Sequence, residues 1–131
     1  MKKLAQVLTL LFSVFSFGAV SQEMEPKNKA EFAKSLFDCY FDSLPSDWNR
    51  LGFIYHRKKE KIEGKQVIEI NANIRKENEE WVPAVACEPM APAAITYAFL
   101  KNTNNHERKF EMLFVMVNKD GSFDVLFDGH Q

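Results

Sequence analysis

The segment FEMLFVMVNKDGSFDVLF, residues 110–127, decides the fold, because two apolar runs flank a strong turn signal. Asn118 suits the first position of the turn, and Gly121 can adopt the left-handed conformation that follows a type I turn. A three-residue loop with a glycine bulge then pairs Asn118 with Ser122. In this register one face is wholly apolar, and its opposite pairs are Leu113 with Phe127, Val115 with Val125, and Val117 with Phe123. The segment therefore predicts an antiparallel hairpin.

A helix is predicted over residues 28–43. Asn28 can cap its N-terminus, and Glu31 follows at the spacing of a capping box. Apolar side chains recur along it at helical spacing and include Cys39. We therefore expect this apolar stripe to pack against the sheet.

Three strands are predicted after this helix. Residues 51–56 and 66–74 alternate between apolar and polar side chains, as half-buried strands do. The charged run 57–65 between them indicates a solvated hairpin tip. Residues 81–86 predict a third strand, which Pro83 restricts to a sheet edge or a bulge.

A second helix over residues 92–101 starts at Pro92, a residue that fits the first turn of a helix. The closing hairpin follows it. The resulting order, α-β-β-β-α-β-β, predicts the α+β class. We expect a single domain in which two helices pack on a mostly antiparallel sheet of about five strands.

The N-terminus has the pattern of a cleavable signal peptide, predicted over residues 1–21. Lys2 and Lys3 precede an almost uncharged apolar run, and small residues at 19–21 favour cleavage before Gln22. A retained membrane anchor is the alternative, but the apolar run is short and no basic flank follows it. The sequence thus predicts a periplasmic protein without a membrane segment, with a domain over residues 22–131.

Removal of this segment leaves 15 basic and 18 acidic residues, a net charge of −3. Nucleic-acid-binding proteins usually carry a strongly basic face. The charge balance therefore argues against a nucleic-acid partner.

Two cysteines, Cys39 and Cys87, lie in the mature part. In an oxidising compartment two thiols usually pair, and a bridge here would contribute about 4 kcal/mol on the chain-entropy model. A reactive thiol is the alternative, and the spacing excludes a CxxC redox motif. We predict a disulfide.

Catalytic and metal-binding motifs are not evident in the sequence. The histidines lie on separate predicted elements without a metal-ligand spacing, so neither a metal nor another cofactor is expected. Glu69 could form a carboxylate pair with a neighbour on an adjacent strand, but solvated strand faces show the same pattern. These observations favour a binding function over an enzyme.

The second face of the closing hairpin carries Phe110, Met112, Phe114 and Met116. If both helices cover the opposite face, these side chains are left open to water and form a candidate self-association surface for a homodimer. If one helix packs on each face, the side chains are buried. The sequence leaves both arrangements open.

Three short motifs carry a family resemblance: LPSDW at 44–48, the strand cores FIY at 53–55 and VIEI at 67–70, and NKDGSF at 118–123. With the element order, they resemble the YezG-type immunity proteins of bacterial toxin systems. Those proteins are cytoplasmic antitoxins, and the tryptophan that precedes their last hairpin is replaced here by the stretch 107–110. The small, exported, single-domain chain is also similar to periplasmic immunity proteins that guard against cell-wall-degrading effectors of type VI secretion.

These resemblances imply a periplasmic immunity protein that occludes the active site of a cognate protein toxin, an enzyme acting on peptidoglycan. We expect the hairpin tip, residues 59–63, to enter the toxin's cleft, supported by the turn before the third strand. Acidic groups of the tip that enter the cleft would match the net charge of −3. A small periplasmic enzyme using surface carboxylates and a self-associating structural protein are the alternatives. The candidate toxin-binding residues are Lys59, Glu60, Lys61, Glu63, Glu79, Glu80 and Trp81.

Overall fold

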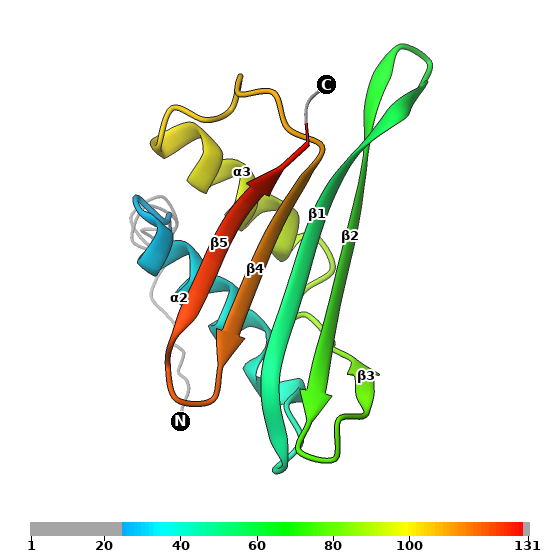
Figure 1. The fold of residues 1–131 in the computed structure, drawn as a ribbon. Helices are drawn as coiled ribbons and strands as arrows, with labels where there is room; N and C mark the ends of the chain where they lie inside the picture. Colours follow the sequence, from blue (N-terminus) through cyan, green and yellow to red (C-terminus); the bar gives the residue numbers. More distant parts are fainter. Residues whose placement is uncertain (1–24, 130–131) are drawn as a thin grey trace, which may run out of the picture.

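The chain folds into two layers, a five-stranded sheet and a pair of helices (Figure 1). The computed structural model describes residues 25–129, so the predicted signal peptide and its cleavage site lie outside the described part. The elements are α2 (Lys29–Tyr40), η1 (Phe41–Ser43), β1 (Trp48–Ile62), β2 (Lys65–Lys76), β3 (Trp81–Pro83), α3 (Ala91–Asn102), β4 (Met112–Asn118) and β5 (Phe123–Asp128).

The strands are ordered β3-β2-β1-β4-β5, and each neighbouring pair is antiparallel. The central strand β1 pairs with β2 on one side and with β4 on the other. This arrangement confirms the predicted α+β class and the predicted order of elements. The third strand is shorter than expected and ends at Pro83.

The closing hairpin has the predicted register. Val115 faces Val125, and the apolar pairs on either side of it also match the prediction. The N–H of Asn118 donates to the carbonyl oxygen of Ser122 at 2.8 Å. Gly121 has a φ of +92°, the left-handed conformation that the bulge requires.

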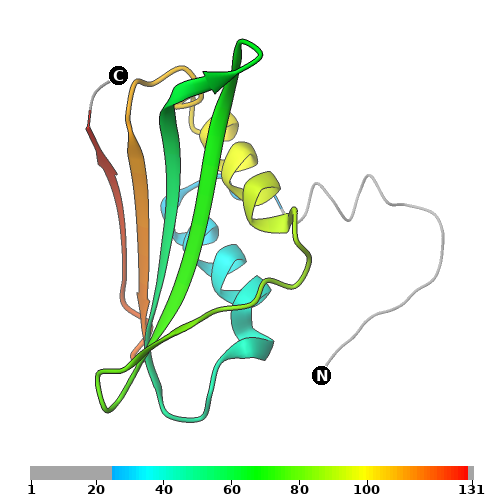
Figure 2. The ribbon, with the colours of Figure 1, turned by 90° about the vertical axis from the view of Figure 1, so that its right-hand side faces the viewer.

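Both helices pack on the same face of the sheet, as Figure 2 shows edge-on. Asn28 caps α2, since its side chain accepts from the N–H of Glu31 at 2.8 Å. The Glu31 side chain accepts in turn from the N–H of Lys27, one residue before the position that a capping box uses. The Phe32 and Phe99 rings stack with centroids 4.1 Å apart and join α2 to α3.

A disulfide joins Cys39 on α2 to Cys87 in the segment between β3 and α3, with a Cα–Cα distance of 4.8 Å. The N–H of Cys87 also donates to the Cys39 sulfur. The bridge confirms the predicted pairing and is typical of exported proteins. Within residues 25–129, no helix is both long enough and apolar enough to cross a membrane.

With both helices on one side, no helix of the described residues covers the second sheet face. Met112, Phe114 and Met116 alternate with the buried residues of β4 and lie half-buried on this open face. The expectation that Phe110 joins them is wrong, because its side chain is only 1% exposed and its ring contacts those of Tyr55 and Phe127. Phe110 precedes β4, so the alternation of the strand does not extend to it.

Candidate functional site

The β1–β2 hairpin extends past the rest of the sheet as a two-stranded arm, residues 58–67. Pairing of β1 with β4 ends where His56 faces Met112, whereas pairing with β2 continues to Ile62 and Lys65. At about 3.3 Å per residue, the part of β1 beyond the sheet projects about 17 Å. Figures 1 and 2 show the arm beyond the upper ends of the other strands.

The predicted solvated hairpin tip over residues 57–65 is confirmed, but most of it is paired strand and not loop, because β1 continues to Ile62 and β2 begins at Lys65. Only Glu63 and Gly64 form the turn, with φ values of +52° and +76°. Two successive positive φ values are typical of two-residue hairpin turns, whose twist matches that of the strands. Charged side chains do not prevent the ladder, because the backbone groups pair whatever side chain they carry.

A register shift marks the base of the arm. Between Arg57 and Lys61, three residues of β1 lie opposite a single residue of β2. Such bulges increase the local twist of a strand pair, and the ribbon twists at this point in Figure 1. Gln66 Nε2 donates to the carbonyl oxygen of Lys58 at 2.7 Å. A side chain thus pairs with a backbone acceptor in the irregular part of the ladder.

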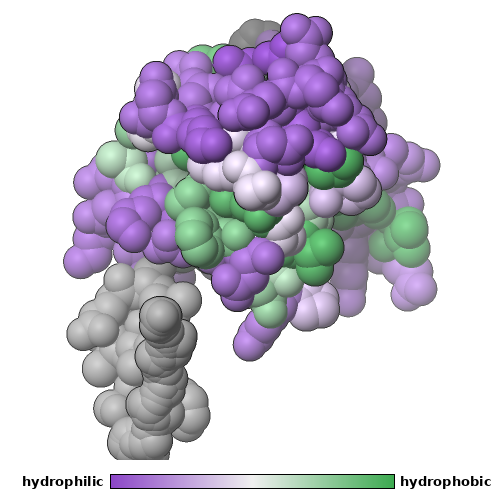
Figure 3. Space-filling model, turned by 90° about the horizontal axis from the view of Figure 1, so that it is seen from below, coloured by the Kyte–Doolittle hydropathy of each residue, from purple (hydrophilic) through white to green (hydrophobic). Residues whose placement is uncertain are grey.

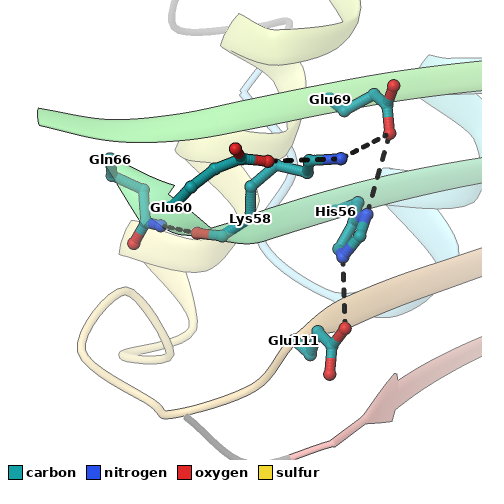
Figure 4. Close-up of polar contacts among 6 residues, drawn as sticks. All are labelled: His56, Lys58, Glu60, Gln66, Glu69 and Glu111. Atoms are coloured by element: carbon teal, nitrogen blue, oxygen red, sulfur yellow. Dashed lines mark hydrogen bonds and ion pairs between the residues drawn. The ribbon is translucent and has the colours of Figure 1, made fainter. Parts of the chain in front are cut away.

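Polar side chains from three segments meet on the open face below the arm (Figure 4). His56 Nε2 lies 3.2 Å from Glu111 Oε2, and its Nδ1 lies 3.8 Å from Glu69 Oε1. Lys58 Nζ lies 3.8 Å from both Glu69 Oε1 and Glu60 Oε1. The network therefore links the lower arm to β2 and to the start of β4. The ion pairs of Lys58 are partly exposed, and such pairs contribute about 0–1 kcal/mol each, so they orient the arm more than they stabilise the fold.

Arg57 fixes the other face of the arm base. Its guanidinium carbon lies 3.8 Å from the centroid of the Phe110 ring, and its nitrogens donate to the carbonyl oxygens of Arg108 and His106. Burial raises the pKa of the neighbouring Tyr55, and the positive charge of Arg57 partly opposes this rise. The arm thus starts from an anchored base.

The arm tip brings together four of the predicted residues, Lys59, Glu60, Lys61 and Glu63, all of them exposed. Ile62 lies beside them with 64% of its surface exposed. The prediction did not include Ile62, although an isolated apolar residue in a charged run was a usable signal. The expectation of an acidic tip is wrong, because residues 58–65 carry four lysines and two glutamates, a net charge of +2.

The turn with Glu79, Glu80 and Trp81 lies at the other end of β2 from the arm tip (Figure 1). The twelve residues of β2 span about 36 Å. The arm tip and this turn are therefore too far apart to enter one cleft of a toxin together. The prediction that the turn supports the tip is wrong. Trp81 is 52% exposed and lies over Gly52 on the open face.

A shallow apolar pocket of about 390 Å³ lies at the lower end of the molecule. Figure 3 looks at this end and shows hydrophobic side chains gathered in its middle, with hydrophilic side chains around them. No Asp, Glu or His lines this pocket, so it does not supply the two converging acids that an enzyme using carboxylates would need. The lining residues are Ala30, Ala33, Lys34, Phe37, Trp48, Val117, Asn118, Lys119, Gly121 and Phe123.

Metal chemistry has no obvious location in the part of the chain from 25 to 129. No group of three or more His, Cys, Asp or Glu side chains there could hold a metal ion.

No protein family model matches the sequence, and no curated protein matches it either. Function must therefore be inferred from the arm, the open face and the disulfide themselves.

Proposed function

We propose that this chain is an exported immunity protein, which binds an antibacterial toxin enzyme and covers its active site. The arm carries this proposal, because it presents an exposed isoleucine and paired charges at the end of a narrow two-stranded projection. A projection of this shape fits a cleft better than a flat surface. The disulfide supports export, since such bridges persist in oxidising compartments.

An inhibitor binds more tightly if it loses little conformational entropy on binding, and the arm meets this requirement. An isolated two-stranded hairpin is only marginally stable in water. This arm instead continues from paired strands, and Gln66, Lys58 and Arg57 fix its base. Less conformational entropy is therefore lost when a partner closes around it.

The charge of the arm indicates the class of toxin. A net charge of +2 over residues 58–65 complements a cleft lined by carboxylates. Enzymes that hydrolyse glycosidic bonds commonly place a pair of acidic residues in such a cleft. A glycosidase that cleaves peptidoglycan is therefore the partner that we propose, with Lys59 and Lys61 directed at its acids.

The test uses a toxin that the protein captures from lysate of its own bacterium and that is encoded beside its gene. Inhibition is measured as the loss of soluble-fragment release from peptidoglycan. We expect Lys59→Glu/Lys61→Glu to weaken inhibition about 100-fold or more, because both charges then repel the cleft. Lys27→Glu/Lys101→Glu makes the same charge change at two exposed positions away from the arm and should inhibit like the wild type.

Equal inhibition by the wild type and the arm variant would show that another surface binds the toxin. Ile62→Asp offers an independent check, since it removes the exposed apolar group and leaves the lysines in place. Circular dichroism of each variant separates lost binding from lost folding.

A further inference from the structure

Among residues 25–129, no strand pairs with the outer edge of β5. In an antiparallel pair, hydrogen-bonded and non-hydrogen-bonded residue pairs alternate. Asn118 and Ser122 form a hydrogen-bonded pair, and the register fixes the alternation along the rest of the hairpin. The N–H and C=O groups of Phe123, Val125 and Phe127 therefore point away from β4, toward the free side of the strand.

This edge carries two aspartates, Asp124 and Asp128, but lacks the stronger features that protect an exposed strand. Proteins block free edges with short strands, prolines or charged side chains, above all lysines. The opposite edge, β3, has three residues and ends in Pro83. The six residues of β5 include neither proline nor lysine, and Phe123 and Leu126 are 39% and 52% exposed. The contrast between the two edges indicates that β5 is covered when the protein functions.

We propose that β5 pairs with β5 of a second copy of this chain, antiparallel, about a two-fold axis that passes through Val125. In this register Val125 faces Val125 of the second copy, and Phe123 faces Phe127. Each of these residues points its free backbone groups outward, so about six hydrogen bonds form across the axis. The two five-stranded sheets then join into one continuous sheet.

The side chains agree with this register. Asp124 lies opposite Leu126 of the second copy, and Asp128 lies opposite Ser122, so no two like charges face each other. The pairing of Phe123 with Phe127 adds an aromatic cross-strand contact on the helix-covered face. The arms belong to β1 and β2, which β4 separates from the new interface. This inference is therefore independent of toxin binding.

The test measures the mass of the purified protein by light scattering or sedimentation at concentrations up to the order of 100 µM. We expect a dimer for the wild type. Leu126→Asp places an acid opposite Asp124 at two positions, which the two-fold axis relates, and should weaken the dimer at least about tenfold. Leu126→Lys instead places a lysine opposite Asp124 and should preserve it. Asp124→Lys/Leu126→Asp again places a lysine opposite an acid and should restore the dimer that Leu126→Asp weakens.

The same pair of variants distinguishes this edge from the open face. Leu126 pairs with Phe114, so association through the open face would be weakened by Leu126→Lys as much as by Leu126→Asp. Equal weakening by both variants, or a wild type that remains monomeric, would overturn the proposal. Asp124→Cys/Leu126→Cys gives a direct readout, because non-hydrogen-bonded partners lie about 4.5 Å apart at Cα and should form disulfide-linked dimers. An oxidised sample without such dimers would also overturn it.

Discussion

Removal of the disulfide is expected to cost this protein a large fraction of its stability. The perturbation is Cys39→Ala/Cys87→Ala, which deletes the bridge without placing a hydroxyl in the core. Alanine at position 39 also removes the sulfur that accepts from the N–H of Cys87, but Cys87 is exposed, so water can replace this weak acceptor. The variant therefore reports mainly on the cross-link.

The magnitude follows from the length of the closed loop. The bridge joins residues 48 positions apart, and on the chain-entropy model a loop of this length restricts the unfolded chain by about 4 kcal/mol at 25 °C. Domains of this size have a free energy of unfolding of about 5–15 kcal/mol. A loss of about 4 kcal/mol leaves about 1–11 kcal/mol, so the variant should remain folded in buffer with reduced stability.

Urea unfolding followed by circular dichroism measures the effect. With a slope of about 2 kcal/mol per molar urea, a loss of about 4 kcal/mol lowers the midpoint by about 2 M. The slope should also rise, because an unbridged chain exposes more surface on unfolding. Reduced wild-type protein is the matched control and should unfold with the variant. A loss below about 1 kcal/mol would refute the cross-link account of stability.

Three further predictions concern local features. Asn28→Ala removes the acceptor for the Glu31 N–H and should lower the free energy of unfolding by about 1 kcal/mol in urea titration. Gly121→Ala should cost about 1–2 kcal/mol, seen as a lower melting temperature, because φ is +92° while no atom lies within 4 Å of the new methyl group. Burial raises the pKa of Tyr40 to about 12, so stability should be lost as pH rises from about 10 to about 12. Ultraviolet titration should show a tyrosine that ionises near pH 12, and a titration in which every tyrosine ionises near pH 10 would contradict this.

The closing hairpin was predictable from sequence because two local signals agree there. The turn residues fix the loop length, and the alternation of Val115, Val117 and their partners fixes the face. A one-residue slip would have placed Val115 opposite Asp124. The pairing of Cys39 with Cys87 was predictable for a simpler reason, since only two cysteines exist.

The arm and the open face were less predictable, because long-range pairing decides them. Nothing local in residues 57–62 indicates a strand, and these residues extend β1 because β2 supplies the backbone partners. Phe110 follows the apolar alternation of β4 in sequence, yet the strand starts two residues later. The N–H of Glu111 bonds to the carbonyl oxygen of Asp128 just before the regular ladder. The alternation of apolar residues therefore predicts the wrong face for a residue that lies beyond the end of the strand.

The strand order also has a kinetic consequence. The β1–β2 and β4–β5 hairpins each join neighbours in sequence, whereas β1 and β4 join residues as far apart as Arg50 and Asn118. Pairing across such a long intervening chain, which includes α3, is entropically slow to begin. The two hairpins should thus form early, and the pairing of β1 with β4 should limit the rate of folding. Substitutions that weaken the pairing between β1 and β4, or that weaken either early hairpin, are then expected to slow folding.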